Sequence, residues 1–142
     1  MARPEQVDGA RPSVVDGLPQ PAQGWVSAAA ALAHEKGGSD IVVIDVTDRL
    51  ALTDAFLLVT AGNPRQAGAI VDAIEEGLSR MSAAMGRCEG RSAGGWVLMD
   101  MGALIVHVMQ AEQRAHYSLE RLWKDCPMEE LPPPPPDTSV RS

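Results

Sequence analysis

The clearest indication of the fold of this chain is the segment Gly95–Met109, GWVLMDMGALIVHVM. It contains two extended apolar segments, Trp96–Met99 and Ala103–Met109, joined by the residues Asp-Met-Gly at 100–102. An Asp and a Gly that flank one residue between apolar runs are typical of a tight turn, so the stretch predicts a β-hairpin. Its β-branched residues favour strands. The second segment is apolar almost throughout, which indicates a strand that is covered on both faces.

Apolar periodicity outside the hairpin predicts the remaining helices and strands. The expected elements are a helix from Ala22 to the Gly37-Gly38 stop, strands at 41–44 and 55–60, a helix that begins at Pro64 after the N-cap Asn63, a weak strand within 82–88, and one or two short helices within 111–123. A hairpin pairs its strands antiparallel, whereas a connection through a helix brings two strands together in parallel. The order of elements therefore predicts a small α/β domain with a mixed sheet of about five strands flanked by helices.

The chain has 142 residues, which is the size of one domain with a core of its own. Prolines, glycines and scattered charge without a period predict a disordered arm over residues 1–21. The folded domain is expected over residues 22–125. Residues 126–142 are expected to form a disordered tail, because the proline run at 132–136 is typical of a stiff polyproline II segment.

The composition disfavours several classes of protein. A net charge of −7 opposes wrapping of a nucleic acid and favours a basic protein partner, so we expect little direct nucleic acid contact. No apolar run approaches 18 residues and the first residues lack a signal-peptide pattern, so we expect a cytoplasmic protein without a membrane span. Cys88 and Cys126 have no Cys-x-x-Cys partner, which favours free thiols over a disulfide or a zinc site.

Acidic residues near the predicted strand ends suggest one alternative, a metal-dependent enzyme. Asp45, Asp48, Asp54 and Asp100 could hold a divalent cation, since carboxylate oxygens are ligands for such ions. A two-metal nucleotidyl-transfer site requires carboxylates paired on one face of a strand, however, and Asp45 and Asp48 lie three residues apart. Capping and turn formation are therefore the favoured roles, and no catalytic, metal-binding or cofactor-binding residue is assigned.

Three residues with ring side chains are further candidates. His107 lies within an apolar strand, where a core or edge histidine is more typical than a catalytic base, and no serine or cysteine is obviously placed as its nucleophile. Trp96 at a strand entrance and Tyr117 in the last helical region each fit two roles, core packing or an exposed binding anchor. The Gly62-Asn63 turn could bind phosphate, but the sequence contains no phosphate-binding loop motif, so a helix cap is favoured.

Five segments, each weak alone, together form a specific ordered series. They are Asp40–Val46 (DIVVIDV), Leu52–Asn63 (LTDAFLLVTAGN), Glu89–Asp100 (EG, five residues, WVLMD), Gly102–Met109 (GALIVHVM) and Tyr117–Trp123 (YSLERLW). In this order they resemble the ribosomal silencing factor family, also known as the Iojap-like proteins. The resemblance covers roughly residues 22–125 and does not include the terminal segments.

The resemblance implies a regulatory function. Members of that family are expected to bind the large ribosomal subunit through ribosomal protein fourteen and to block its joining with the small subunit. This would lower translation during starvation or stationary phase. Their fold resembles a nucleotidyltransferase-like α/β domain without the set of catalytic carboxylates. The resemblance therefore implies a protein that is not an enzyme and uses no cofactor.

The resemblance also implies which residues face the partner. Trp96 and Tyr117 match family positions on the partner-facing surface, and Glu89, Asp100 and His107 match further family positions. One position departs from the pattern: a second acidic residue usually follows the glycine of the hairpin turn, and Ala103 stands there in this chain.

Two alternatives stay open at the level of sequence. One is a metal-dependent nucleotidyltransferase-like enzyme that uses Asp45, Asp48 or Asp100. The other is a homodimer or larger scaffold that associates through the alanine-rich first helix. Titration with nucleotide and Mg²⁺ distinguishes the enzyme from the regulator.

Overall fold

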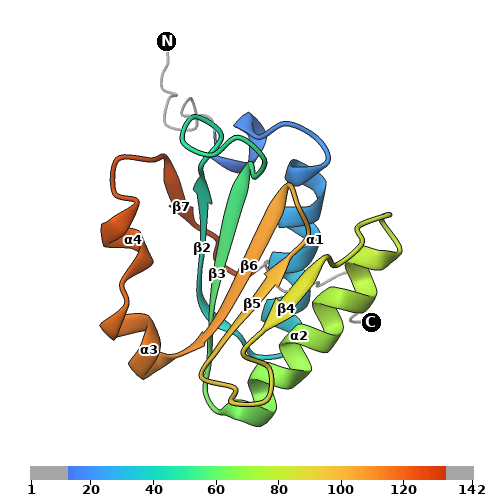
Figure 1. Ribbon diagram of the computed structural model, residues 1–142, viewed down its shortest axis with the longest axis vertical. Helices are drawn as coiled ribbons and strands as arrows, with labels where there is room; N and C mark the ends of the chain where they lie inside the picture. Colours follow the sequence, from blue (N-terminus) through green and yellow to red (C-terminus); the bar gives the residue numbers. More distant parts are fainter. Residues whose placement is uncertain (1–12, 134–142) are drawn as a thin grey trace, which may run out of the picture.

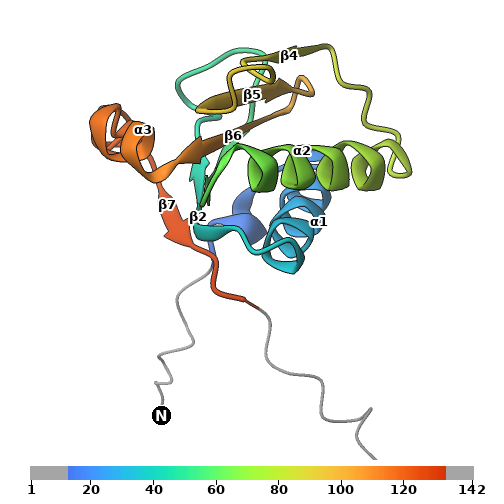
Figure 2. The same cartoon turned by 90° about the horizontal axis from the view of Figure 1, so that it is seen from below.

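The computed structural model describes residues 13–133. Two helices, α1 (Ala22–Glu35) and α2 (Pro64–Ser79), lie side by side on one face of a six-stranded mixed sheet (Figures 1 and 2). The strands are β2 (Ser39–Asp45), β3 (Ala55–Ala61), β4 (Arg87–Glu89), β5 (Trp96–Asp100), β6 (Leu104–Gln110) and β7 (Met128–Glu130), in the order β4-β5-β6-β3-β2-β7. The short helices are η2 (Val15–Gly17), α3 (Ala111–His116) and α4 (Leu119–Leu122). The predicted α/β class is confirmed, with one strand more than expected.

The predicted hairpin is confirmed. Strands β5 and β6 pair antiparallel from Trp96 opposite Met109 to Asp100 opposite Ile105. Gly102 closes the turn with φ of +83°, a conformation that glycine adopts without strain, and its N–H donates to Asp100 Oδ1 at 2.8 Å. Strand β6 also pairs in parallel with β3, which gives the parallel pair that the helical crossover requires.

The face of the sheet under α1 and α2 is a closed aliphatic core. Asn63 caps α2, since its Oδ1 accepts a 2.8 Å hydrogen bond from Gln66 N, and Pro64 occupies the first helical position as predicted. Fully buried side chains from both helices meet alternate residues of the strands; they include Val26, Val43, Leu57, Ile70, Ile74, Leu104 and Val106. Each buried aliphatic side chain of this size contributes about 1.5–3 kcal/mol relative to an exposed one.

The opposite face is covered over only part of its width. The segment that contains α3 and α4 crosses the sheet on the side away from α1 and α2 (Figure 1). Its apolar side chains pack on β2, β3 and β6 in a second, smaller cluster, whose buried members are Ile44, Val46, Phe56, Leu58, Met109, Leu119 and Cys126. Strands β4 and β5 contribute half-buried or exposed side chains to this face.

The folded domain extends beyond both of its predicted boundaries, residues 22 and 125. Strand β7 pairs antiparallel with β2 and Leu131 N donates to Ile41 O at 2.8 Å, so the fold continues past residue 125. Leu18, before the predicted start at residue 22, is buried in the helix-side core. A three-residue edge strand is too short to show a periodic pattern. Its structure depends on pairing with β2 and not on its own sequence. The rest of the predicted arm and tail, residues 1–12 and 134–142, lies outside the described residues.

Two further predictions concern the whole chain. Within residues 13–133, no helix has the length and apolar character needed to cross a membrane. Both cysteines are free thiols: Cys126 is buried, whereas Cys88 is half-buried.

Candidate functional site

All five predicted partner-binding residues lie on, or reach, the partly covered face of the sheet. Side chains alternate between the two faces along a strand, so Trp96 and Asp100 of β5 point to the same face. Cross-strand pairing places Glu89 of β4 and His107 of β6 on that face as well. Tyr117 reaches it from the turn between α3 and α4.

An aromatic cluster, formed by Phe56, Trp96, His107, Tyr117 and Trp123, occupies this face. The Trp96 ring centroid lies 5.1 Å from that of Tyr117 and 6.0 Å from that of His107. The Phe56 ring meets both His107 and Trp123 edge to face, with 5.2 Å between centroids. These separations fall in the range that stabilises aromatic pairs. Tyr117 is 51% exposed and His107 is 6% exposed, so the cluster extends from the core to the surface.

His107 fixes the orientation of the Trp96 indole. The indole Nε1–H donates to His107 Nδ1 at 3.1 Å, which requires that Nδ1 carries no proton. Burial lowers the pKa of His107 to about 4, so the ring is neutral near pH 7 and its proton resides on Nε2. Within the described residues, the buried Nε2 has no hydrogen-bond partner. His107 is therefore a buried histidine with one nitrogen satisfied by Trp96, and the indole N–H is already engaged inside the protein.

An ion pair between Arg114 and Glu120, which the sequence did not predict, connects the two short helices on either side of Tyr117. The Arg114 guanidinium is 11% exposed; it donates through Nη1 to Thr60 Oγ1 at 2.9 Å and through Nη2 to Glu120 Oε2 at 2.6 Å. Desolvation raises the pKa of Glu120, but hydrogen bonds from Arg114 and the backbone, with the charge of Arg114, outweigh it and hold that pKa below its ordinary value. The pair joins α3 to α4 on either side of Tyr117. Its members are six residues apart, a spacing that no helical pattern signals.

Glu89 borders a shallow pocket beside Trp96. The pocket is lined by Glu89, Gly90, Trp96 and Leu98. Gly90 has φ of +84°, and a Cβ at this position would overlap the backbone carbonyl of Trp96, so only glycine allows β4 to turn this close to β5. Leu98 was not among the predicted site residues, although alternation along β5 places it on the same face as Trp96.

Asp100 lies apart from this group. It is at the opposite end of β5 from Trp96, which corresponds to about 13 Å along an extended strand. Its carboxylate accepts the hydrogen bond from Gly102 N that closes the hairpin turn. The structure thus brings Glu89, Trp96, His107 and Tyr117 together and gives Asp100 a turn-forming role.

The carboxylates of the enzyme alternative are not gathered at one place. Asp45 on β2 accepts from Thr47 N at 3.0 Å and from Thr47 Oγ1 at 2.6 Å, which is local turn formation. Strands β3 and β6 separate β2 from β5, so Asp45 and Asp100 are roughly 14 Å apart across the sheet and belong to opposite faces. Over residues 13–133, no three His, Cys, Asp or Glu side chains cluster in a way that could hold a metal ion.

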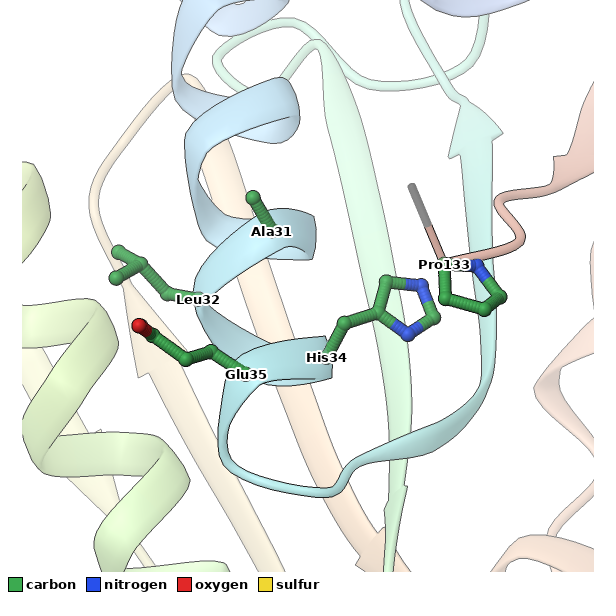
Figure 3. Close-up of a pocket in the computed structure, with 5 residues that line it drawn as sticks. All are labelled: Ala31, Leu32, His34, Glu35 and Pro133. Atoms are coloured by element: carbon green, nitrogen blue, oxygen red, sulfur yellow. The ribbon is translucent and has the colours of Figure 1, made fainter. Parts of the chain in front are cut away.

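A second hollow lies on the outer side of α1, next to the C-terminal segment (Figure 3). It is lined by Ala31, Leu32, His34, Glu35 and Pro133. Figure 3 shows that His34 points toward Pro133, whereas Glu35 points to the other side of the helix, so the two do not form a paired site. His34 Nε2 donates to Leu131 O at 2.8 Å and thereby attaches the C-terminal segment to α1.

The alanines of α1, on which the homodimer alternative depends, are mostly used inside the domain. Ala22, Ala29, Ala30 and Ala33 are buried, whereas Ala31 is exposed. The buried alanines allow α1 to approach the sheet and α2 closely. Little of the apolar surface of this helix is therefore left for a second copy of the chain.

The known proteins that resemble this chain point to one family. The family model described as "Ribosomal silencing factor during starvation" matches residues 19–142. The ribosomal silencing factor of Bacillus subtilis is 32% identical over 103 residues, which span 72% of this chain and 87% of that protein. That of Haemophilus influenzae is 34% identical over 86 residues, 61% of this chain and 84% of that protein. A mouse protein named for mitochondrial assembly of the ribosomal large subunit is 28% identical over 95 residues, 65% of this chain and 42% of that protein.

Two solved structures share the fold. A protein from Chromobacterium violaceum superposes with a TM-score of 0.69 at 25% identity, covering 84% of this chain and 95% of the other. A protein from Bacillus halodurans superposes with a TM-score of 0.67 at 28% identity, covering 77% of this chain and 99% of the other. The arrangement of helices and strands described above is therefore shared with bacterial proteins over nearly their whole length.

Proposed function

The chain belongs to the ribosomal silencing factor family, and from this premise we propose that it represses translation by binding the large ribosomal subunit and obstructing its joining with the small subunit. The contact is made with ribosomal protein fourteen, through the surface around Trp96 and Tyr117. The protein acts in the cytoplasm, where the subunits meet. No chemical step is required, because a bound protein excludes the small subunit sterically.

The single observation that carries this proposal is the exposed end of the aromatic cluster. Tyr117 is half-exposed and packs against Trp96, which is itself fixed by His107. Tryptophan and tyrosine are the residue types most enriched among interface residues that dominate binding energy, and rigid aromatic rings lose little entropy on binding. A surface built in this way is suited to a protein partner.

The net charge of this chain and the name of one relative both support a ribosomal protein as the partner. The net charge of −7 favours association with a basic ribosomal protein and disfavours extensive contact with RNA. The mouse relative is named for assembly of the mitochondrial ribosomal large subunit. An interface of ordinary size, roughly 1,600 Å² in total, is sufficient for stable occupancy.

The experiment that tests the proposal is co-sedimentation of the purified protein with isolated large and small subunits, followed by a subunit-joining assay. We expect binding to the large subunit alone and a decrease in joined ribosomes as the protein is added. Absence of large-subunit binding would overturn the proposal. Saturable, Mg²⁺-dependent binding of a nucleotide in calorimetry would instead support the enzyme alternative.

A matched pair of variants links this activity to the site. Tyr117→Ala removes the exposed ring of the aromatic cluster and should reduce both binding and the block of subunit joining. Leu52→Ala removes an apolar side chain that is 88% exposed in the β2–β3 loop, at the other end of the sheet, and should change neither. Equal effects of the two substitutions would contradict the location of the interface.

A further inference from the structure

The pocket beside Trp96 has a composition that selects for one kind of side chain. Its walls are apolar, formed by the Trp96 ring and Leu98, and its border carries the exposed carboxylate of Glu89. The Trp96 side chain has a single N–H group, which donates its hydrogen bond to His107. Within this lining, the side chains therefore offer apolar surface and a hydrogen-bond acceptor with negative charge, and no free donor.

An occupant must match both properties. A purely apolar side chain would cover the Glu89 carboxylate without replacing its hydrogen bonds with water, and an acidic one would be repelled. A lysine or arginine side chain has a long aliphatic stem and a charged group that only donates. Its charged end is attracted both to a carboxylate and to the face of an indole ring.

We propose that the pocket lined by Glu89, Gly90, Trp96 and Leu98 receives one lysine or arginine side chain of the basic partner protein. The aliphatic stem lies against Trp96 and Leu98, and the charged end pairs with Glu89. This rests on the proposed function and adds a chemical identity to the partner residue at the centre of its interface.

Two features of the structure favour binding of such a side chain in the pocket. The Trp96 ring is held by His107 and Tyr117, so it needs no reorganisation on binding. Glu89 pairs with Arg87, whose Nε lies 3.1 Å from Glu89 Oε2, and both side chains are 59% exposed. An exposed pair of this kind is weak and a carboxylate accepts several hydrogen bonds, so an incoming cation displaces Arg87 or shares the carboxylate with it.

The test compares charge removal at two matched sites in the full-length protein. Glu89→Gln keeps the size of the side chain and should raise the dissociation constant for the large subunit about threefold to tenfold, with a weaker dependence on salt. Glu75→Gln makes the same change at an exposed position of α2, on the opposite face of the sheet, and should leave affinity unchanged. Equal affinities for these two variants would overturn the proposal.

Two further variants separate recognition from a structural role of β4. If Glu89 served only to pair with Arg87, Arg87→Gln would weaken binding as much as Glu89→Gln, and this result would also overturn the proposal. We expect Arg87→Gln to bind at least as tightly as the wild type, because it releases the carboxylate. Glu89→Lys should weaken binding more than tenfold, and one Lys→Glu or Arg→Glu substitution in ribosomal protein fourteen should restore it.

The outcomes distinguish failure of this inference from failure of the proposed function. If the wild-type protein does not bind the large subunit, the proposed function fails and the pocket loses its partner. If the wild type binds and no single charge reversal in ribosomal protein fourteen rescues Glu89→Lys, the proposed function stands and the inference about the pocket is wrong.

Discussion

The two faces of the sheet differ in what their side chains accomplish. Beneath α1 and α2, alternate residues of the strands are apolar and buried, and they pack against the apolar side chains of the two helices. On the other face, aromatic rings and hydrogen-bonded polar groups take the place of aliphatic packing, and part of β4 and β5 is left uncovered. The first face stabilises the fold, and the second adds orientation, charge and exposed surface to it.

The contrast between the two faces explains the buried polar groups of the candidate site. Aliphatic side chains pack tightly but do not fix the rotation of an exposed ring. The hydrogen bond from Trp96 to His107 fixes the rotation of the indole, and those from Arg114 to Thr60 and Glu120 attach α3 and α4 to the sheet and to each other, because each bond has a preferred direction. They do so at a cost in desolvation, which the lowered pKa of His107 makes visible. The comparison predicts that the two faces respond differently to mutation.

The largest expected effect on stability is on the closed face. Leu57→Ala removes a fully buried side chain at the centre of β3 and should lower the free energy of unfolding by about 3 kcal/mol, through lost burial and the cavity that remains. Urea unfolding followed by circular dichroism measures this. Protein that remains folded should bind the large subunit with unchanged affinity. A reduced affinity of the folded variant would show that the faces are not separate in function.

The next effect is a dependence of stability on pH that belongs to the partly covered face. The pKa of His107 in the fold is about 4, below its ordinary value of 6.5, so the unfolded chain binds a proton more readily between these values. Stability from this residue is therefore fully present above pH 6.5 and is lost as the pH falls toward 4, by up to about 3 kcal/mol. Urea midpoints measured from pH 7 to pH 4 should decrease more for the wild type than for His107→Gln.

The control for this pH dependence is His116→Gln, which removes an exposed histidine from α3. Carboxylates that titrate in the same range contribute equally to all three proteins and cancel in the comparison. If His107→Gln and the wild type lose stability in parallel, the buried, neutral state assigned to His107 is wrong.

A smaller effect in free energy, but the most specific for function, is expected at Trp96. Trp96→Ala should weaken binding to the large subunit by about 2 kcal/mol, the size typical of an aromatic residue that dominates an interface. Its unfolding free energy should fall by less than that of Leu57→Ala, because Trp96 is half-buried. Isothermal titration and urea unfolding of both variants provide the comparison. Wild-type binding by a folded Trp96→Ala protein would remove Trp96 from the interface.

The sequence predicted the parts of the fold that depend on local pattern. The hairpin at residues 95–109, the Asn63 cap and the amphipathic face of α2 are each encoded within about a dozen residues, and each is confirmed. Strand β7 lies in the segment for which the sequence predicts a disordered tail, because its three residues are ordered by pairing with β2 and show no periodic pattern of their own. Local periodicity thus identifies an element only when that element is long enough to display it.

The candidate site was predictable to a different degree. Family resemblance implied Trp96, Tyr117, Glu89, Asp100 and His107, but their distances depend on strand order and register, which the sequence alone does not determine. The structure places four of them together and Asp100 at the far end of β5. Support for Tyr117 comes from contacts between residues with no regular spacing, which can be found only in three dimensions.

The smallest expected effect on stability concerns the hydrogen bonds that Arg114 makes beside Tyr117. Arg114→Met keeps much of the apolar stem and removes the two hydrogen bonds to Thr60 and Glu120, which should lower the unfolding free energy by about 1 kcal/mol. Glu120 would then retain its desolvation without its cationic partner, so its pKa should rise, a change that nuclear magnetic resonance titration detects. Arg121→Met, at an exposed position of α4, is the matched control and should change neither quantity. Because Arg114 holds α3 and α4 on either side of Tyr117, its loss should also weaken large-subunit binding; unchanged binding would mean that Trp96 alone positions the tyrosine ring.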